Sequence, residues 1–292
     1  MVDQDCNKIS PTAIFSTYFR RDTGIGYAER LAQVSNAEAF TRRFVTPELF
    51  PQIGFIASTF EGKYRAIQKY IADRPDHNVL HLGCALLTHG LFVPEGVKYL
   101  GLDLPDMIET RRRIFADAGV QYPAGYRDQV CNILDREGLE RAVRDFLPKD
   151  KRILVVHESL LYHFTLPEKK RLTETMASFG RDYGLTWANT DMAIKPDIIK
   201  LLDTYPALSE LIMFIIDRTG RDLVANSYPS VDAAAEVLTS TGFKFNKEVD
   251  IHPLYTEGSF PVNTLPSEGK ERQIALGILR SLNTWMAKFD PE

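Results

Sequence analysis

The chain has no long hydrophobic run, few cysteines and no excess of positive charge, and each of these absences excludes a class of protein. No stretch approaches the roughly 18 uninterrupted apolar residues that a membrane-spanning helix needs. Residues 1–20 mix acidic, polar and short apolar segments and lack the pattern of a signal peptide. The formal net charge of −4 over 292 residues argues against a general nucleic-acid-binding protein. We therefore expect a cytoplasmic, globular protein that binds neither nucleic acid nor a membrane.

The three cysteines, Cys6, Cys84 and Cys131, are an odd number and stand in unrelated local contexts. This pattern fits reduced thiols better than a framework of disulfides. No spacing of the kind found in metal sites joins the cysteines to the six histidines. We predict no metal centre.

Strand-like and helix-like segments alternate along most of the chain. Strands are predicted at residues 79–82, 97–102, 129–133, 152–156, 185–189 and 243–249, and helices at residues 28–32, 37–44, 59–71, 106–117, 136–146, 167–179, 231–239 and 276–289. Such alternation is typical of the α/β class, in which helices cover both faces of a mainly parallel sheet. Because ligands of these sheets bind beyond the carboxyl ends of the strands, the loops that follow the strands are the places to search for a site.

The length suits one enlarged α/β domain. We divide the expected single domain, 1–292, into a helical N-terminal extension (1–75), a cofactor-binding core (76–190), a helical lid insertion (191–230) and the C-terminal part of the sheet (231–292). The insertion is inferred from apolar residues that recur at helical spacing from Lys195 to about Ala225.

Three residues at predicted strand ends are candidates for a binding site. Gly83 follows the first strand and lets a ligand approach the backbone, although many strand-to-helix turns look the same. Asp103 follows roughly 20 residues later, where a carboxylate can bind ribose hydroxyls or can cap the next helix. Glu158 follows the strand at 152–156 and is either a ligand-binding carboxylate or a solvated loop charge.

Four segments stand out in chain order: Ile9-Ser-Pro-Thr-Ala13, Phe60-Glu-Gly-Lys-Tyr-Arg65, Tyr99-Leu-Gly-Leu-Asp-Leu-Pro105 and His157-Glu-Ser-Leu-Leu-Tyr162. Together they resemble the leucine carboxyl methyltransferase family, and in particular its bacterial branch of polyketide O-methyltransferases. The resemblance implies a Rossmann-like class I methyltransferase sheet of seven mostly parallel strands, with an N-terminal helical extension and a helical lid insertion. It also implies S-adenosylmethionine as the cofactor and a small molecule as the methyl acceptor, with a homodimer as one possible assembly.

The same resemblance assigns cofactor contacts to residues of this chain. Gly83 would line the methionine portion, Asp103 would hold the ribose, and Glu158 would face the amino-acid end. Asn132 and Ile133 would border the adenine, where an Asn side chain can hydrogen-bond the base edge.

On the acceptor side the resemblance implies roles for Arg65, Tyr162 and Arg20, of which Arg65 would also meet a carboxylate of the cofactor. Methyl transfer is a direct displacement, so the protein must align the acceptor oxygen and exclude water. A carboxylate acceptor is already ionised and needs only Arg65 or Arg20 to hold it. A hydroxyl acceptor needs a general base, and the candidates are His157, His163 and His89.

The loop after the first strand departs from the family pattern, because Ala85 stands where the family has a second glycine. Ala85 fits without strain only if its φ stays negative, since a left-handed backbone at a non-glycine residue costs roughly 1–2 kcal/mol. The change leaves open a second function, a degenerate methyltransferase-fold protein that serves as a binding or scaffold module. A nicotinamide-dependent dehydrogenase ranks lower because the loop lacks Gly-x-Gly-x-x-Gly.

Overall fold

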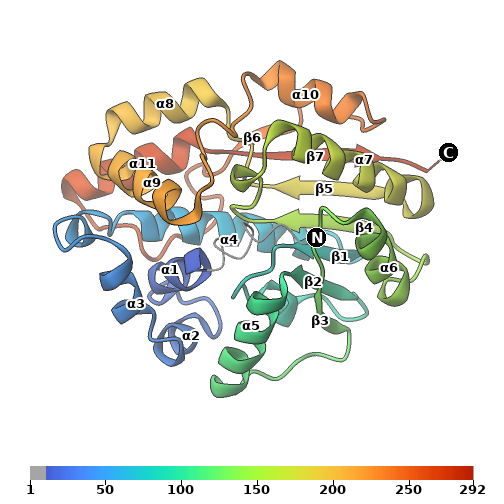
Figure 1. The fold of residues 1–292 in the computed structure, drawn as a ribbon, viewed down its shortest axis with the longest axis horizontal. Coiled ribbons are helices and arrows are strands. Elements are labelled where there is room, and N and C mark those ends of the chain that lie inside the picture. The colour runs from blue at the N-terminus through green and yellow to red at the C-terminus, as the bar shows by residue number, and fades with distance from the viewer. Residues whose placement is uncertain (1–10, 292) are drawn as a thin grey trace.

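The structure, a computed structural model that describes residues 11–291, is built on a seven-stranded sheet (Figure 1). The strands are β1 (His77–Leu82), β2 (Tyr99–Asp103), β3 (Tyr126–Val130), β4 (Arg152–His157), β5 (Leu185–Asn189), β6 (Ile251–Pro253) and β7 (Asn283–Phe289). Their order across the sheet is β3-β2-β1-β4-β5-β7-β6. Strands β1 to β5 pair in parallel, and β7 runs antiparallel to both β5 and β6. The predicted mostly parallel α/β sheet is confirmed.

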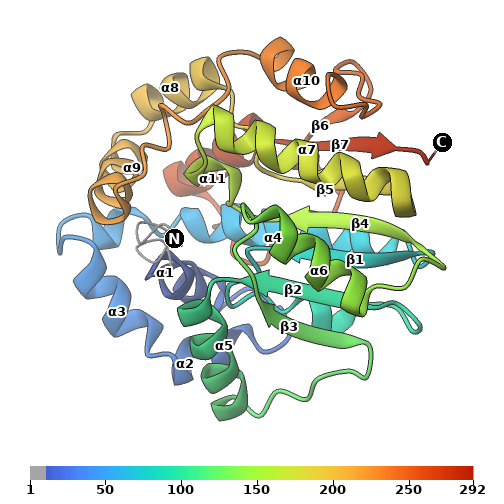
Figure 2. The ribbon, with the colours of Figure 1, turned by 45° about the vertical axis from the view of Figure 1, so that its right-hand side comes forward.

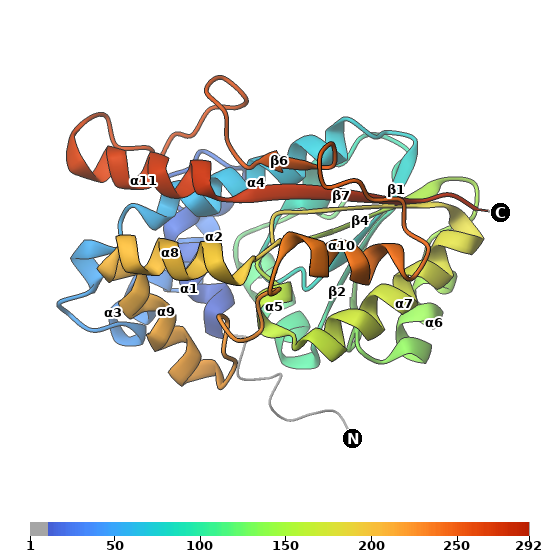
Figure 3. The same ribbon diagram turned by 90° about the horizontal axis from the view of Figure 1, so that it is seen from above.

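Helices pack on both faces of the sheet (Figures 1 and 3). Those nearest to it are α4 (Ile56–Ala72), α5 (Pro105–Asp117), α6 (Arg136–Phe146), α7 (Leu166–Tyr183) and α10 (Val231–Thr239). In strand β4, Ile153 and Val155 join a buried cluster with residues of α6, α7 and α10, whereas Leu154 and Val156 pack with residues of α4. Successive side chains of a strand point to opposite faces, so an unbroken apolar run is what a strand covered on both sides requires.

A second group of helices gathers beyond the carboxyl ends of the parallel strands (Figure 2). It consists of α1 (Pro11–Arg20), α2 (Ala28–Val34), α3 (Ala37–Phe44), α8 (Lys195–Thr204), α9 (Pro206–Thr219) and α11 (Gly269–Ser281). Phe15 of α1, Leu211 of α9 and Ile278 of α11 belong to one buried apolar cluster. Segments far apart in the sequence therefore close the end of the sheet at which a ligand is expected. Helices α8 and α9 lie within the predicted lid insertion.

Two predictions near the C-terminus are wrong. The helix expected at 276–289 ends with α11 at Ser281, and residues 283–289 form strand β7 instead. The strand expected at 243–249 is reduced to one bridge between Lys244 and Lys288, and β6 follows it. Leu282, Trp285, Met286 and Phe289 recur at helical spacing, whereas Trp285, Ala287 and Phe289 alternate as in a strand. Pairing with β5 decides in favour of the strand.

Parts of two sequence features lie outside the described residues, namely Ile9 and Ser10 of the N-terminal motif, and Cys6. Cys84 and Cys131 are free and buried. No helix formed by residues 11–291 combines the length and the apolar character needed to cross a membrane.

Candidate active site

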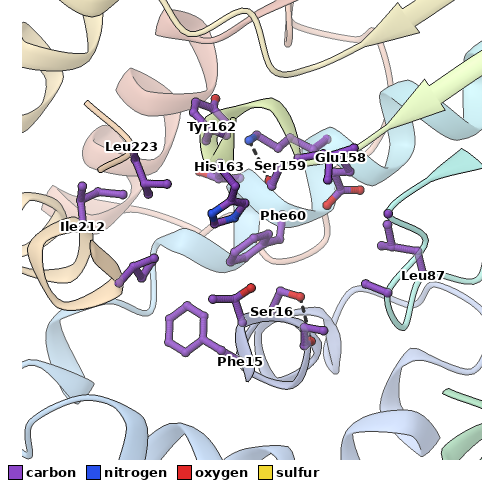
Figure 4. A pocket seen from close by; sticks show the side chains of 18 of the residues that line it. Phe15, Ser16, Phe60, Leu87, Glu158, Ser159, Tyr162, His163, Ile212 and Leu223 are labelled. Carbon is purple, nitrogen blue, oxygen red and sulfur yellow. Dashed lines mark hydrogen bonds between the residues drawn. The ribbon is translucent and has the colours of Figure 1, made fainter. Parts of the chain in front are cut away.

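A cavity of 290 Å³ lies beyond the carboxyl ends of β1, β2 and β4, between the loops that follow these strands and the helices α1, α4, α8, α9 and α11 (Figure 4). Its two ends differ in chemistry. The charged lining residues are Asp103 and Glu158 of the strand loops, Arg20 of α1 and Lys63 of α4, while the lining residues of α8, α9 and α11 are apolar. Representative apolar lining residues are Phe15, Ile56, Phe60, Leu201, Ile212 and Ile278. This is the position at which doubly wound sheets bind their ligands.

Gly83, Asp103 and Glu158 line this same cavity, as the strand-end argument predicts. They meet because β1 lies between β2 and β4 in the sheet, so the ends of the three strands are neighbours. Gly83 has a φ of +64°, and a Cβ at this position would lie 2.9 Å from Cδ1 of Leu160. A side chain here would be strained by the backbone conformation and crowded by Leu160.

The Asp103 carboxylate accepts hydrogen bonds from two backbone N–H groups. Its Oδ2 accepts a hydrogen bond from the Ala85 N–H at 2.8 Å, and its Oδ1 accepts one from the Leu104 N–H at 2.8 Å. Burial raises the pKa of Asp103, and these two N–H groups oppose the rise. Each carboxylate oxygen has a further lone pair, so the group can still accept two hydrogen bonds from vicinal hydroxyls.

Ala85 adopts the left-handed conformation, with a φ of +42°, so the negative φ that would have avoided strain is not found. Contacts on both sides of the residue hold it there. Its N–H donates to Asp103, and its carbonyl accepts a hydrogen bond at 2.6 Å from Nη1 of the buried Arg111. The strain of roughly 1–2 kcal/mol expected for a non-glycine residue here is therefore tolerated because the surroundings fix both peptide groups.

Replacing Ala85 by glycine is expected to stabilise the protein. The Ala85→Gly variant relieves the left-handed strain but adds backbone entropy to the unfolded chain, so we expect a net gain of about 0.5–1 kcal/mol in the free energy of unfolding by urea titration. Ala235→Gly, in the interior of α10, is the matched control and should instead lose about 0.5–1 kcal/mol. Destabilisation of both variants alike would contradict this account of Ala85.

Glu158 and Arg20 form a buried ion pair at the charged end of the cavity, between Oε1 and Nη2. Burial alone raises the pKa of Glu158, but the Arg20 guanidinium and His89 outweigh it and bring the pKa below its ordinary value. Among the described residues, Oε2 of Glu158 and Nε of Arg20 have no hydrogen-bond partner. Both atoms are shielded from water, and Oε2 of Glu158 lies 3.9 Å from Nε2 of His89. The pair borders the cavity with one negative and one positive charge, which complement an ammonium and a carboxylate carried by one molecule.

Arg65, predicted to meet a carboxylate, lies outside the lining of the cavity. Its Nε donates to Oε1 of Glu61 at 2.7 Å, and its Nη2 donates to the carbonyl of Thr23 at 2.9 Å. The first contact lies within helix α4, and the second ties this helix to the segment that follows α1. This placement does not support the predicted role of Arg65 in the site.

Lys63 is the α4 cation that lines the cavity, and sequence reasoning missed it. Its Nζ donates to Oγ of Ser159 at 3.1 Å, lies 3.7 Å from Oδ1 of Asp191 and lies 4.9 Å from the ring centroid of Tyr162. Burial lowers the pKa of Lys63, but Tyr162 and the two nearby carboxylates reverse this effect and raise it. Side chains two residues apart on a helix point to nearly opposite sides. Lys63 and Arg65 of α4 therefore cannot both face the cavity.

Asp191 is the second residue that the sequence argument missed. It is completely buried and accepts hydrogen bonds from the N–H groups of Ser159 at 2.7 Å and Leu160 at 2.6 Å, and it lies 3.0 Å from Nδ1 of His157. It thereby holds the loop after β4, in which Ser159 has a φ of +57°. A carboxylate two residues beyond the apolar strand β5 is the same signal that pointed to Glu158, and it could have been used here.

The loop after β3 forms another wall of the cavity. Because β3 ends at Val130, earlier than predicted, Asn132 and Ile133 leave the sheet and line the cavity. Oδ1 of Asn132 accepts a hydrogen bond from the Leu134 N–H at 3.1 Å. Ile133 is buried beside it and presents an apolar surface suited to the face of a base.

Of the three histidines considered as bases, only His163 lines the cavity, together with Tyr162. His157 is turned toward Asp191. His89 stacks on Tyr64 with ring centroids 3.9 Å apart, and its Nδ1 lies 2.9 Å from Oε1 of Gln68.

The fold is that of the class I Rossmann-like methyltransferases. Its marks are the sheet order, with β7 as the antiparallel strand between β5 and β6, and the cavity at the carboxyl ends of the parallel strands. Two solved structures share it across nearly the whole chain. A candidate methyltransferase from Thermobifida fusca is 12% identical with a TM-score of 0.53, covering 95% of this chain and 94% of its own. A DUF574 family protein from Streptomyces avermitilis is 10% identical with a TM-score of 0.58, covering 96% and 97%.

Sequence similarity is more local. The tetracenomycin polyketide synthesis O-methyltransferase TcmP of Streptomyces glaucescens is 32% identical over 94 residues, which are 32% of this chain. The match covers 31% of that relative's own length. No protein-family model matches the chain.

Proposed function

We propose that the protein is an S-adenosylmethionine-dependent methyltransferase that methylates an oxygen atom of a small molecule. The observation that carries the proposal is the convergence of the Arg20–Glu158 pair and Asp103 on one cavity. A zwitterionic amino-acid end and a ribose diol are the groups that these side chains complement. The positions of Glu158 after β4 and of Asp103 at the end of β2 support the resemblance to the leucine carboxyl methyltransferase family.

The residues fit the cofactor part by part. The Glu158 carboxylate would face its ammonium, while the Arg20 guanidinium and the Lys63 ammonium would face its carboxylate. Asp103 would accept from the ribose hydroxyls, and the loop carrying Asn132 would flank the adenine. When bound, this group supplies a methyl that its sulfonium activates for direct displacement.

The remainder of the cavity is suited to an apolar acceptor. Side chains of α1, α8, α9 and α11 surround it, and they include Phe15, Leu201, Ile212 and Ile278. Such walls align the acceptor by shape and keep water from the reacting atoms. The local match to a polyketide-synthesis O-methyltransferase supports a bulky, largely apolar small molecule with oxygen as the methylated atom.

A binding or scaffold module, the alternative motivated by the loss of a glycine, gains no support from the loop. Ala85 keeps the left-handed bend at which glycine is favoured, and its N–H still reaches Asp103. Side chains leave the cavity unfilled, and the charged residues Arg20, Asp103 and Glu158 line it.

Calorimetric titration with S-adenosylhomocysteine tests the proposal. We expect the wild-type protein to bind it and Asp103→Ala to bind at least about 10-fold more weakly, because hydrogen bonds to a charged group contribute roughly 1.5–3 kcal/mol. Asp106→Ala, at an exposed position in the first turn of α5, is the matched control and should bind like the wild type. Thermal unfolding should show both variants folded. Absence of binding by the wild type at millimolar ligand would refute the proposal.

A further inference from the structure

His89 is a buried residue that lies behind the wall of the cavity, beside the Arg20–Glu158 pair. It begins the short 3-10 turn η3 (His89–Phe92), is completely buried and lies outside the lining of the cavity. Its Nε2 lies 3.9 Å from Oε2 of Glu158, and neither atom has a hydrogen-bond partner in the described part of the chain. Buried polar atoms in folded proteins are nearly always satisfied, so the two atoms point to a proton or a ligand group that binds at this place.

The hydrogen bonds of Gln68 decide which nitrogen of the His89 ring carries a hydrogen. The side-chain N–H of Gln68 donates to the carbonyl of Phe92 at 3.1 Å, and a carbonyl can only accept. Oε1 of Gln68 therefore faces Nδ1 of His89, at 2.9 Å, and this nitrogen must be the donor. The neutral His89 ring consequently has no hydrogen on Nε2 and presents a lone pair to the Glu158 carboxylate. Only the imidazolium places an N–H there.

We infer that a proton on Nε2 of His89 competes with the ammonium of the cofactor for the Glu158 carboxylate. The inference rests on the proposed function, under which Glu158 faces that ammonium, and it makes His89 a positioning residue of the cofactor site. In the protonated protein, the N–H of the imidazolium is directed at Glu158 and adds a positive charge near the position of the ammonium. When the cofactor binds, Nε2 gives up this proton to the solvent and the ring returns to its neutral form. One proton is thus released for each cofactor that binds to the protonated protein.

The other charged and titratable groups around the His89 ring keep their charge near neutral pH. They are Arg20, Tyr64, His81, Arg111 and Glu158. Burial lowers the pKa of His81 well below its ordinary value and raises that of Tyr64, so both stay neutral. Burial raises the pKa of Glu158, but Arg20 and His89 outweigh this effect, so Glu158 stays ionised. His89 is therefore the member of this group that can change its charge between about pH 5 and pH 8.

The direction of the pH dependence follows from the surroundings of the ring. Burial lowers the pKa of His89, Glu158 opposes this decrease, and the charges of Arg20 and Arg111 add to it. The ring is thus neutral near pH 8 and gains its proton as the pH falls below its ordinary pKa of about 6.5. Because the protonated form disfavours the cofactor, affinity should be highest at the alkaline end of the range and should fall toward the acid end.

Calorimetric titration with S-adenosylhomocysteine over this range tests the inference. We expect its Kd to rise by at least about 3-fold from about pH 8 to pH 5. Binding at the acid end should also release protons, which titrations in two buffers of different ionisation enthalpy detect. His89→Gln cannot take up a proton and should show neither effect. His252→Gln, at an exposed position, is the matched control and should behave like the wild type.

Methylthioadenosine is the control ligand, because it has the ribose and adenine of the cofactor but neither the ammonium nor the carboxylate. Asp103 is a second group whose charge can change toward acid pH, since burial raises its pKa. Titration of Asp103 should alter the Kd of both ligands, whereas titration of His89 should alter chiefly that of S-adenosylhomocysteine. The ratio of the two Kd values should therefore follow the protonation of His89.

Gln68→Glu tests the same ring without removing it. A carboxylate beside Nδ1 of His89 stabilises the imidazolium, so the pH at which this ratio changes should move upward by about one pH unit. Gln121→Glu, at an exposed position before β3, adds the same charge elsewhere and should leave the curve in place. A ratio independent of pH in the wild type, an equal change in His89→Gln, or an unmoved curve in Gln68→Glu would overturn the inference. Failure of the wild type to bind S-adenosylhomocysteine at any pH would instead refute the proposed function.

Discussion

Asp191→Ala is expected to lower the free energy of unfolding by about 3–5 kcal/mol, the range measured when one partner of a buried charged network is removed. The carboxylate is fully buried, and its loss would leave the N–H groups of Ser159 and Leu160 without their acceptor. It would also remove the negative charge beside Nδ1 of His157 and the buried Lys63 ammonium. Urea unfolding followed by the fluorescence of Trp187, which packs against His157, would measure the change. Asp203→Asn, at an exposed position on α8, should alter the stability by less than about 0.5 kcal/mol.

The same carboxylate should make the protein sensitive to acid. Burial raises the pKa of Asp191, but His157, Lys63 and the Leu160 N–H lower it well below its ordinary value. A group whose pKa is depressed by folding stabilises the folded state above its unfolded-state pKa, near 4, and loses this contribution as the pH falls further. The difference in stability between the wild type and Asp191→Asn should therefore shrink from about pH 5 downward. A difference that stays constant over this range would show that the Asp191 charge does not matter.

The mostly parallel sheet and the three strand-end residues could be predicted because both follow from local signals. An unbroken apolar run such as Ile153–Val156 identifies a strand buried on both faces, and the alternation with helices implies parallel pairing. Parallel strands end at one edge, so Asp103 after β2 and Glu158 after β4 had to approach each other once both strands paired with β1. Their convergence on the cavity needs no long-range information beyond the sheet order.

The features that could not be predicted depend on how elements pack. Arg65 and Lys63 both lie off the apolar stripe of α4, and only the position of that helix against the sheet and the α1 segment decides which one reaches the cavity. Strand β7 resembles a helix in its apolar spacing until β5 and β6 are in place beside it. The left-handed Ala85 depends on Arg111, which follows 26 residues later in the chain. No window of local sequence contains these relations.

Arg111→Met is expected to destabilise the protein by about 3–5 kcal/mol and, in addition, to weaken cofactor binding. The guanidinium is completely buried, donates from Nε to Oδ2 of Asp128 at 2.8 Å and from Nη1 to the Ala85 carbonyl at 2.6 Å, and also contacts the Tyr126 hydroxyl. Removing it leaves the buried Asp128 carboxylate without its cation. It also leaves the carbonyl of Ala85, the strained residue in the loop after β1, without its donor. Urea unfolding and titration with S-adenosylhomocysteine measure the two consequences separately.

Two further substitutions, each combined with Arg111→Met, separate the loss of stability from the loss of cofactor affinity. Asp128→Asn removes the unpaired charge, so the double variant Arg111→Met/Asp128→Asn should recover much of the stability but little of the affinity, because the Ala85 carbonyl still lacks its donor. Ala85→Gly needs no support for its left-handed backbone, so Arg111→Met/Ala85→Gly should recover affinity while the stability lost at Asp128 stays lost. If adding Asp128→Asn to Arg111→Met restored both the stability and the affinity, the contact from Arg111 to the Ala85 carbonyl would have no part in shaping the loop. The charge of Asp128 alone would then explain why a cation is buried there.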